Sequence, residues 1–129
     1  MITRRDIIAG AGAVAVLAAA SSHAAPTGTS TMYGLIGKMK VVPGRRDALV
    51  AILLEGLQNM PGCLSYIVAH DPADPDAIWI TEAWDSKASH AASLQLASVK
   101  AAIAKGRAMI AGFGERFETT PVGGQGLGK

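Results

Sequence analysis

Between residues 32 and 120 the hydrophobic periodicity of the chain changes several times, and the order of these changes restricts the fold more than any other feature. Residues 78–84 (IWITEAW) alternate as a strand does, which places Glu82 and Trp84 on one face. The alternation stops at Asp85-Ser86, where both residue types favour a helix N-terminus. A segment rich in Ala and Ser follows. The stretch therefore predicts a strand that runs directly into a helix.

The same criteria predict four strands and two helical regions. The strands are expected at residues 32–42, 63–70, 77–84 and 113–120, and the helical regions at 45–59 and 86–110, the second with a bend near 93–97. The loop at residues 71–76 contains two prolines and three aspartates and joins the second and third strands as an antiparallel hairpin. Its composition predicts that none of it is buried.

The order strand, helix, strand, strand, helix, strand is that of a ferredoxin-like α+β fold, βαββαβ. Both helices of such a fold lie on one face of the antiparallel sheet, so the other face needs a cover. About 90 residues form the ordered domain. We therefore expect a homodimer in which the sheets of two copies pack together.

The N-terminus is predicted to be a signal peptide at residues 1–24. Arg4-Arg5 precedes a short apolar run, and small residues surround a cleavage point after Ala24 or, as second choice, Ala25. The paired arginines resemble the twin-arginine export signal of bacteria. A transmembrane anchor is the alternative, but about 14 apolar residues are fewer than the ~20 that span a bilayer. Export predicts a periplasmic or secreted protein.

Three further segments follow the signal peptide. A flexible lead-in is expected at residues 25–31, the folded domain at 32–121 and a flexible Gly-rich tail at 122–129. The whole chain has a net charge of +2, and loss of Arg4, Arg5 and Asp6 would leave +1. This balance gives no electrostatic reason to expect nucleic acid or a membrane surface as a partner. The single cysteine, Cys63, excludes an internal disulfide.

Glu82, Trp84 and His90 form the densest group of chemically capable side chains. His90 can transfer a proton near neutral pH, or it can be a partly exposed helix residue without a role. Trp84 can form the wall of an aromatic pocket or belong to the core. Glu82 shares a strand face with apolar residues, so its carboxylate is expected to be partly buried. It then needs a partner, which can be His90, an arginine or helix amides.

Tyr66 and Tyr33 lie on predicted strands and can present hydroxyl groups to a pocket or simply pack. His70, where the second strand ends, is expected to be solvated. The sequence contains no HExxH zinc motif, no GxSxG nucleophile motif and no GxGxxG that opens a helix. No metal or organic cofactor is therefore predicted.

Two motifs and the element order together resemble the antibiotic biosynthesis monooxygenase (ABM) domain family, and most of all its quinol monooxygenase-like members. The motifs are Pro-Gly-Cys-x-x-Tyr at residues 61–66 and Glu-x-Trp-x-Ser at 82–86 with His90 downstream. The resemblance spans residues 32–121. It implies a dimeric α+β barrel that oxygenates quinols or anthrones without a cofactor, with Trp84 and His90 lining a pocket and Glu82 as the strand carboxylate. In many members the histidine lies further beyond the aromatic residue.

The predicted function is a cofactor-independent monooxygenase acting on a quinol or related phenolic. His90 and Trp84 are assigned as catalytic, and Tyr66, Glu82 and Tyr33 as substrate-binding. Its partners would be a small aromatic substrate, dioxygen and a second copy of the chain, with no nucleic acid and no stable membrane association after cleavage. A non-catalytic dimeric module that binds a hydrophobic small molecule stays open, because a fold does not dictate a function. Haem binding or degradation is a third reading, although the first strand lacks the asparagine of haem-degrading members.

Overall fold

The structure, a computed structural model, describes residues 30–127, and the expected signal peptide at residues 1–24 lies outside this range. Four strands, three α-helices and one short 3-10 helix make up the described domain. In chain order they are β2 (Tyr33–Val41), α2 (Arg46–Gly56), β3 (Cys63–His70), β4 (Ala77–Trp84), α3 (Lys87–Ser93), α4 (Ala97–Gly106), the 3-10 helix η2 (Arg107–Met109) and β5 (Ile110–Thr119).

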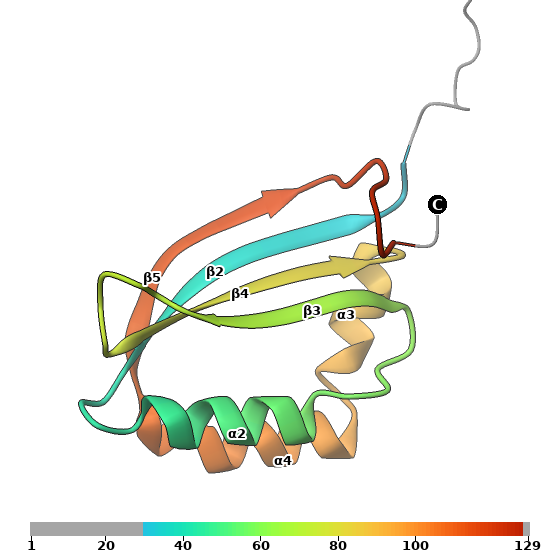
Figure 1. The fold of residues 1–129 in the computed structure, drawn as a ribbon. Helices are drawn as coiled ribbons and strands as arrows, with labels where there is room; N and C mark the ends of the chain where they lie inside the picture. Colours follow the sequence, from blue (N-terminus) through green and yellow to red (C-terminus); the bar gives the residue numbers. More distant parts are fainter. Residues whose placement is uncertain (1–29, 128–129) are drawn as a thin grey trace, which may run out of the picture. The chain divides into compact units, whose positions relative to one another are not determined.

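The strands form one antiparallel sheet in the order β3-β4-β2-β5. Helices α2 and α4 lie side by side along one face of this sheet, and α3 lies near the end of β4 (Figure 1). This arrangement confirms the ferredoxin-like α+β prediction. Strands β3 and β4 have the predicted bounds and pair as the predicted hairpin.

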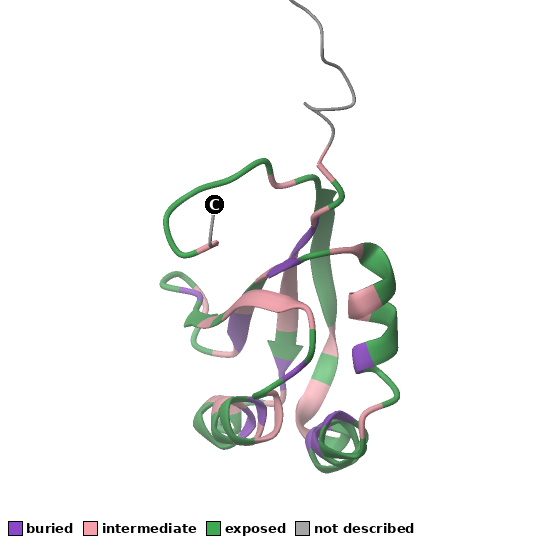
Figure 2. Cartoon of the chain, turned by 90° about the vertical axis from the view of Figure 1, so that its right-hand side faces the viewer, coloured by how far each residue is buried: buried purple, intermediate pink, exposed green. Residues whose placement is uncertain are grey.

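Apolar side chains fill the space between the sheet and the helices. We call this side of the sheet the helix face and the opposite side the open face. Figure 2 shows the exposed surfaces of α2 and α4 on their outer sides. The buried residues form two clusters, one of Tyr33, Leu35, Met60, Trp84 and Val99, the other of Val41, Leu49, Leu53, Ile78 and Ile80.

Helix α2 ends at Gly56, three residues before the predicted end. Glycine has low helix propensity, and Gly56 is also where α2 meets α4, since an added Cβ would lie 2.6 Å from the Cβ of Ala102. Asn59 then takes a left-handed conformation, with φ 55°, which leads the chain out of the helix. Helix propensity alone could not locate this end, because the close approach of the two helices comes from tertiary packing.

The second helical region divides into α3 and α4, at the predicted bend. The N–H groups of Leu94, Gln95 and Leu96 bond to carbonyl groups three residues earlier, which tightens the chain into turns between the helices. Strand β5 begins at Ile110 and not at residue 113 as predicted. Ile110 pairs with Val41 at the end of the sheet, and this pairing extends the strand backwards.

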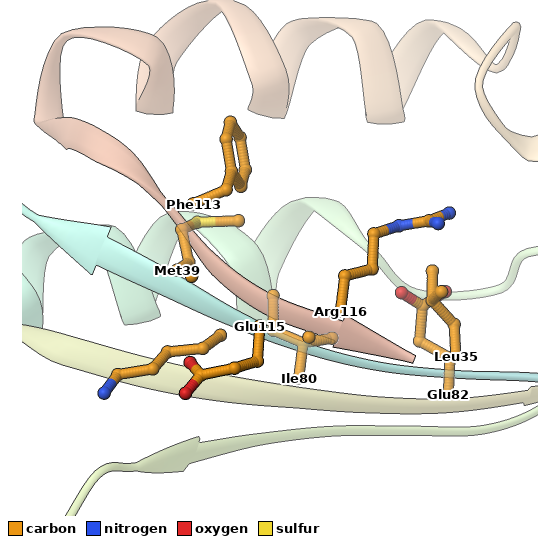
Figure 3. A pocket seen from close by; sticks show the side chains of 10 residues that line it. Leu35, Met39, Ile80, Glu82, Phe113, Glu115 and Arg116 are labelled. Atoms are coloured by element: carbon orange, nitrogen blue, oxygen red, sulfur yellow. The ribbon is translucent and has the colours of Figure 1, made fainter. Parts of the chain in front are cut away.

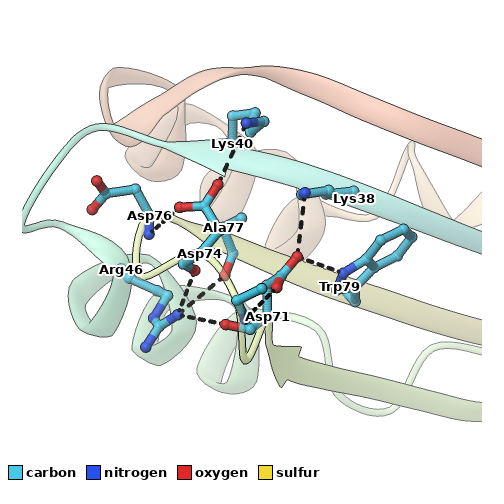
Figure 4. A network of polar contacts seen from close by, with 9 residues as sticks. Lys38, Lys40, Arg46, Asp71, Asp74, Asp76, Ala77 and Trp79 are labelled. Carbon is cyan, nitrogen blue, oxygen red and sulfur yellow. Dashed lines mark hydrogen bonds and ion pairs between the residues drawn. The ribbon is translucent and has the colours of Figure 1, made fainter.

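The prediction that the whole 71–76 loop is exposed is wrong for Asp71, which is only 8% exposed. Its carboxylate accepts hydrogen bonds from Trp79 Nε1 at 3.0 Å and from the backbone N–H of Ala73 at 2.8 Å, and it forms an ion pair with Lys38 at 3.2 Å (Figure 4). These contacts, first among them the Ala73 N–H, lower the pKa of Asp71. Three donors thus replace the water that a buried carboxylate loses.

Arg46, at the start of α2, forms hydrogen bonds to the backbone of the same loop. Its guanidinium donates to the carbonyl oxygens of Asp74 at 3.0 Å, Ala77 at 3.3 Å and Asp71 at 3.4 Å (Figure 4). His70, as predicted, is exposed, and its Nε2 lies 3.8 Å from the carboxylate of Asp47 on α2. The β3–β4 loop is therefore tied to both the sheet and α2.

The open face carries a row of three apolar side chains and one threonine across its four strands. Strand pairing places Ile67, Thr81, Ile36 and Phe117 side by side in this row. Ile67 is 54% exposed and Phe117 is 53% exposed. In the part of the chain that the structure describes, no helix is long and apolar enough to cross a membrane.

Candidate active site

A cavity of about 270 Å³ lies between the helix face of the sheet and the helices. Its walls are mostly apolar side chains of α2 and α4, and its polar groups come from the sheet and α3. The polar and aromatic lining residues are Tyr66, Glu82, Trp84, His90, Ser93 and Phe113. Four of the five side chains predicted to form a site, from Tyr66 to His90, thus converge on one cavity.

Glu82 and Trp84 point into the cavity because they are two residues apart on β4. Trp84 Nε1 donates a hydrogen bond of 2.9 Å to Glu82 Oε1, and His90 Nε2 lies 3.8 Å from the same oxygen. The Trp84 and His90 rings meet edge to face with their centroids 5.4 Å apart. The partner of Glu82, which the sequence left open, is therefore chiefly the Trp84 indole, with His90 beside it. Trp84 is 1% exposed, so it is both a core residue and a cavity wall.

Helix α3 brings His90 to this position. Ser86 caps the helix, because its hydroxyl oxygen accepts from the backbone N–H of Ser89 at 3.1 Å, as the sequence predicted for this segment. Gly62 lies against the first turn of α3 with φ +83°, and a Cβ there would come within 2.5 Å of Ser89. The Pro-Gly turn before β3 thus lets α3 pack closely enough for His90 to enter the cavity.

Burial affects the protonation of two polar groups in the cavity wall, Glu82 and Tyr66. Burial raises the pKa of Glu82, although the Trp84 hydrogen bond and the electrostatic interactions with His90 and Arg116 act in the opposite direction. Burial also raises the pKa of Tyr66 well above its ordinary value, and the nearby Glu82 carboxylate adds to this effect. The pKa of Glu82 is therefore closer to neutral pH than that of an exposed glutamate, while the Tyr66 hydroxyl stays protonated.

Tyr33 does not line this cavity, although it was predicted to bind the substrate. Its ring packs on His90 with centroids 5.2 Å apart, and its hydroxyl donates to Glu118 Oε2 at 2.5 Å. The amine of Lys87 lies 5.7 Å from the centre of the same ring. Tyr33 thus packs against the His90 ring and does not itself line the cavity.

Sequence reasoning missed two residues of β5 near the cavity, Phe113 and Arg116. Phe113 pairs with Met39 and Arg116 with Gly37, so both belong to the helix face although they are three positions apart. A β-bulge between these pairs makes this possible. Strict alternation would have assigned them to opposite faces. Within residues 30–127, no three His, Cys, Asp or Glu side chains come together as a metal-binding group.

Comparisons with known proteins identify the family and show the same fold. A crystal structure of a candidate antibiotic biosynthesis monooxygenase from Chloroflexus aurantiacus J-10-fl shares 68% identity over 75% of this chain and 99% of that one, with a TM-score of 0.73. Structures from Pseudomonas aeruginosa (20% identity, 73% and 97% coverage, TM-score 0.63) and Nitrosomonas europaea (17%, 78% and 97%, 0.64) share the fold. No curated protein matches the sequence. The profile of the antibiotic biosynthesis monooxygenase family matches residues 32–105, and the chain belongs to this family.

Proposed function

We propose that the protein is a cofactor-independent monooxygenase that oxidises a small electron-rich aromatic, a quinol or related phenol, with dioxygen. The observation that carries this proposal is the convergence of Glu82, Trp84 and His90 on one largely apolar cavity. Membership of the monooxygenase family supports the reaction class. The cavity, at about 270 Å³, suits a molecule with one or two rings.

The first step is removal of a proton from a substrate hydroxyl. The His90–Glu82 pair receives this proton, because its two polar groups lie 3.8 Å apart inside the cavity and burial raises the pKa of Glu82. Trp84 holds the carboxylate in place through its 2.9 Å hydrogen bond. The resulting substrate anion is electron-rich enough to transfer an electron to dioxygen.

The reaction balances without another reductant. One oxygen atom of dioxygen forms a new bond to a ring carbon, and the other leaves as water. A quinol gives up four electrons when it becomes a hydroxyquinone, and dioxygen takes up four electrons in this process. The protein needs only to remove a proton, hold the ring beside dioxygen and keep water away from the intermediates. The apolar side chains of α2 and α4, such as Leu53 and Val99, serve the last purpose.

Oxygen uptake by the purified protein with a panel of quinols and anthrones tests the proposal, with a chelator present. The change of His90 to alanine is expected to lower the rate about 100-fold or more, as is typical when a proton-transfer group is lost. His70→Ala is the matched control, since His70 lies on the surface at the end of β3 and should leave the rate unchanged. No uptake above the spontaneous rate would favour a binding module, and a Soret band on haem titration would favour haem chemistry.

We further propose that two copies of the chain pair through their open faces, where Ile67 and Phe117 are each more than half exposed. Phe117→Glu should then convert a dimer into a monomer in light scattering, whereas Glu115→Gln should not. The paired arginines Arg4-Arg5 support export to the periplasm or beyond. Loss of export after both are changed to lysine would be the expected result.

A further inference from the structure

A second cavity, of about 200 Å³, adjoins the candidate active site on the same helix face. It lies over β2 and β5, and its apolar floor includes Leu35 and Ile80 (Figure 3). Met39, Glu82 and Phe113 line both cavities. A ligand in the first cavity can therefore extend past Glu82 into the second.

The second cavity exists because Gly37 occupies a position where the strand would otherwise present a side chain. Gly37 lies between Leu35 and Met39 on the helix face of β2, and its neighbours across the strands are Ile80 and Arg116. A Cβ built at Gly37 would meet nothing within 4 Å, and its φ is not in the left-handed region. Neither crowding nor backbone conformation requires glycine here. Glycine in a strand interior weakens the strand and often marks the close approach of a ligand.

The charged side chains of Lys38, Glu82, Glu115 and Arg116 line this cavity, and the Glu115 carboxylate points away from the Arg116 guanidinium (Figure 3). Figure 3 shows the Arg116 guanidinium extending from β5 into the space above the sheet, on the side where Glu82 lies. Among residues 30–127 no carboxylate forms an ion pair with Arg116. Its charge nevertheless acts on its surroundings, because it opposes the rise in the pKa values of Glu82 and Tyr33 and helps to lower the pKa of Glu118. A planar guanidinium binds a carboxylate through two parallel hydrogen bonds.

We propose that this second cavity is a subsite for an acidic group on the aromatic substrate, with Arg116 binding the anion and Gly37 leaving the room for it. That the ligand is also a substrate rests on the proposed function, whereas the subsite concerns ligand binding alone. The preferred ligand is thus an aromatic ring that carries a carboxylate as well as a hydroxyl.

Electrostatics determines which way such a ligand lies. The carboxylate of Glu82 repels an anion, whereas it accepts a hydrogen bond from a neutral phenol. The substrate hydroxyl therefore points to Glu82 and His90, and the acidic group points to Arg116. Met39 and Phe113 line both cavities, lie on the other side of this space from Glu82 and Arg116 (Figure 3), and contact the ring from there.

The test compares two matched probes, hydroquinonecarboxylic acid and its uncharged carboxamide, by titration calorimetry under argon. The wild-type protein should bind the acid about tenfold more tightly than the amide, as expected for one good charge-assisted contact. Arg116→Gln should bring this ratio close to one. Arg45→Gln removes an equal charge from the exposed residue before α2 and should leave the ratio unchanged.

A second pair of variants tests the role of the space at Gly37. Gly37→Val fills the subsite and should weaken the binding of both probes about tenfold or more. Gly112→Val is the control, because a Cβ at Gly112 also meets nothing within 4 Å but lies on the open face opposite Lys40. Both valine variants should keep the circular dichroism spectrum of the wild type, since valine favours strands.

Equal affinity for the acid and the amide, or no measurable binding of either, would overturn the subsite proposal. An acid preference that survives Arg116→Gln would also overturn it. The outcome is separate from the proposed reaction, because no oxygen is present. Tight, Arg116-dependent binding of the acid without later oxygen uptake would leave the subsite standing and refute the oxygenase. Oxygen uptake without tighter binding of the acid would support the oxygenase and refute the subsite.

Discussion

Replacement of Trp84 by phenylalanine should remove one identifiable interaction from the centre of the site. Trp84 is 1% exposed, and its Nε1–H donates at 2.9 Å to Glu82 Oε1. No other hydrogen bond to the Glu82 carboxylate is found within residues 30–127, and His90 Nε2 lies 3.8 Å from its Oε1. Phenylalanine keeps an aromatic ring in place but cannot donate.

The magnitude follows from two contributions. A buried acceptor that loses its donor destabilises the fold by about 1–3 kcal/mol. The smaller ring leaves unfilled space, which adds about 1 kcal/mol. The free energy of unfolding should therefore fall by about 2–4 kcal/mol, and for a domain of this size each kcal/mol lowers Tm by about 4–8 °C. A fall in Tm of at least about 8 °C is expected.

Urea denaturation and thermal melting measure this change, and Trp79→Phe is the matched control. Trp79 Nε1 also donates to a carboxylate, that of Asp71, but Asp71 keeps the Ala73 N–H at 2.8 Å and Lys38 at 3.2 Å. The fall in Tm for Trp79→Phe should be less than half of that for Trp84→Phe. Equal losses in the two variants would refute the reasoning that Glu82 depends on a single donor.

Three other predictions concern the surroundings of the site. Burial raises the pKa of Glu82 in the folded state, so its ionised form destabilises the fold. Glu82→Gln should therefore be more stable than wild type at pH 8. In urea denaturation at several pH values, this difference should shrink as the pH falls through the pKa of Glu82 in the folded state. Arg46→Met removes donors to three carbonyl groups and should speed amide hydrogen exchange at residues 71–76. Gly56→Ala should lower Tm despite alanine's helix propensity, because its Cβ would lie 2.6 Å from that of Ala102.

Periodicity and turn residues predicted most of the fold, because each strand has one face against the helices. The alternation from Ile78 to Trp84 gave both bounds and facing of β4 correctly. It also indicated that Glu82 would be partly buried. The end of α2 at Gly56 was not predictable in this way, since it depends on where a second helix passes.

The candidate site was only partly predictable from the sequence. His90 and Tyr66 reach the cavity because their strand and helix positions are regular. Arg116 was missed because a bulge in β5 changes which face it occupies, and a bulge leaves no reliable mark in local composition. The burial of Asp71 was missed because its partners come from β2 and β4, and their side chains meet it only in the folded sheet.

The most direct test of the central claim is the fate of the oxygen atoms. The purified protein would turn over a quinol under isotopically labelled dioxygen in ordinary water, and mass spectrometry would follow the product before exchange with solvent. The proposed reaction predicts one labelled oxygen atom in the product, lost in His90→Ala and retained in His70→Ala. A product whose new oxygen comes from water, or a quinone without added oxygen, would contradict it.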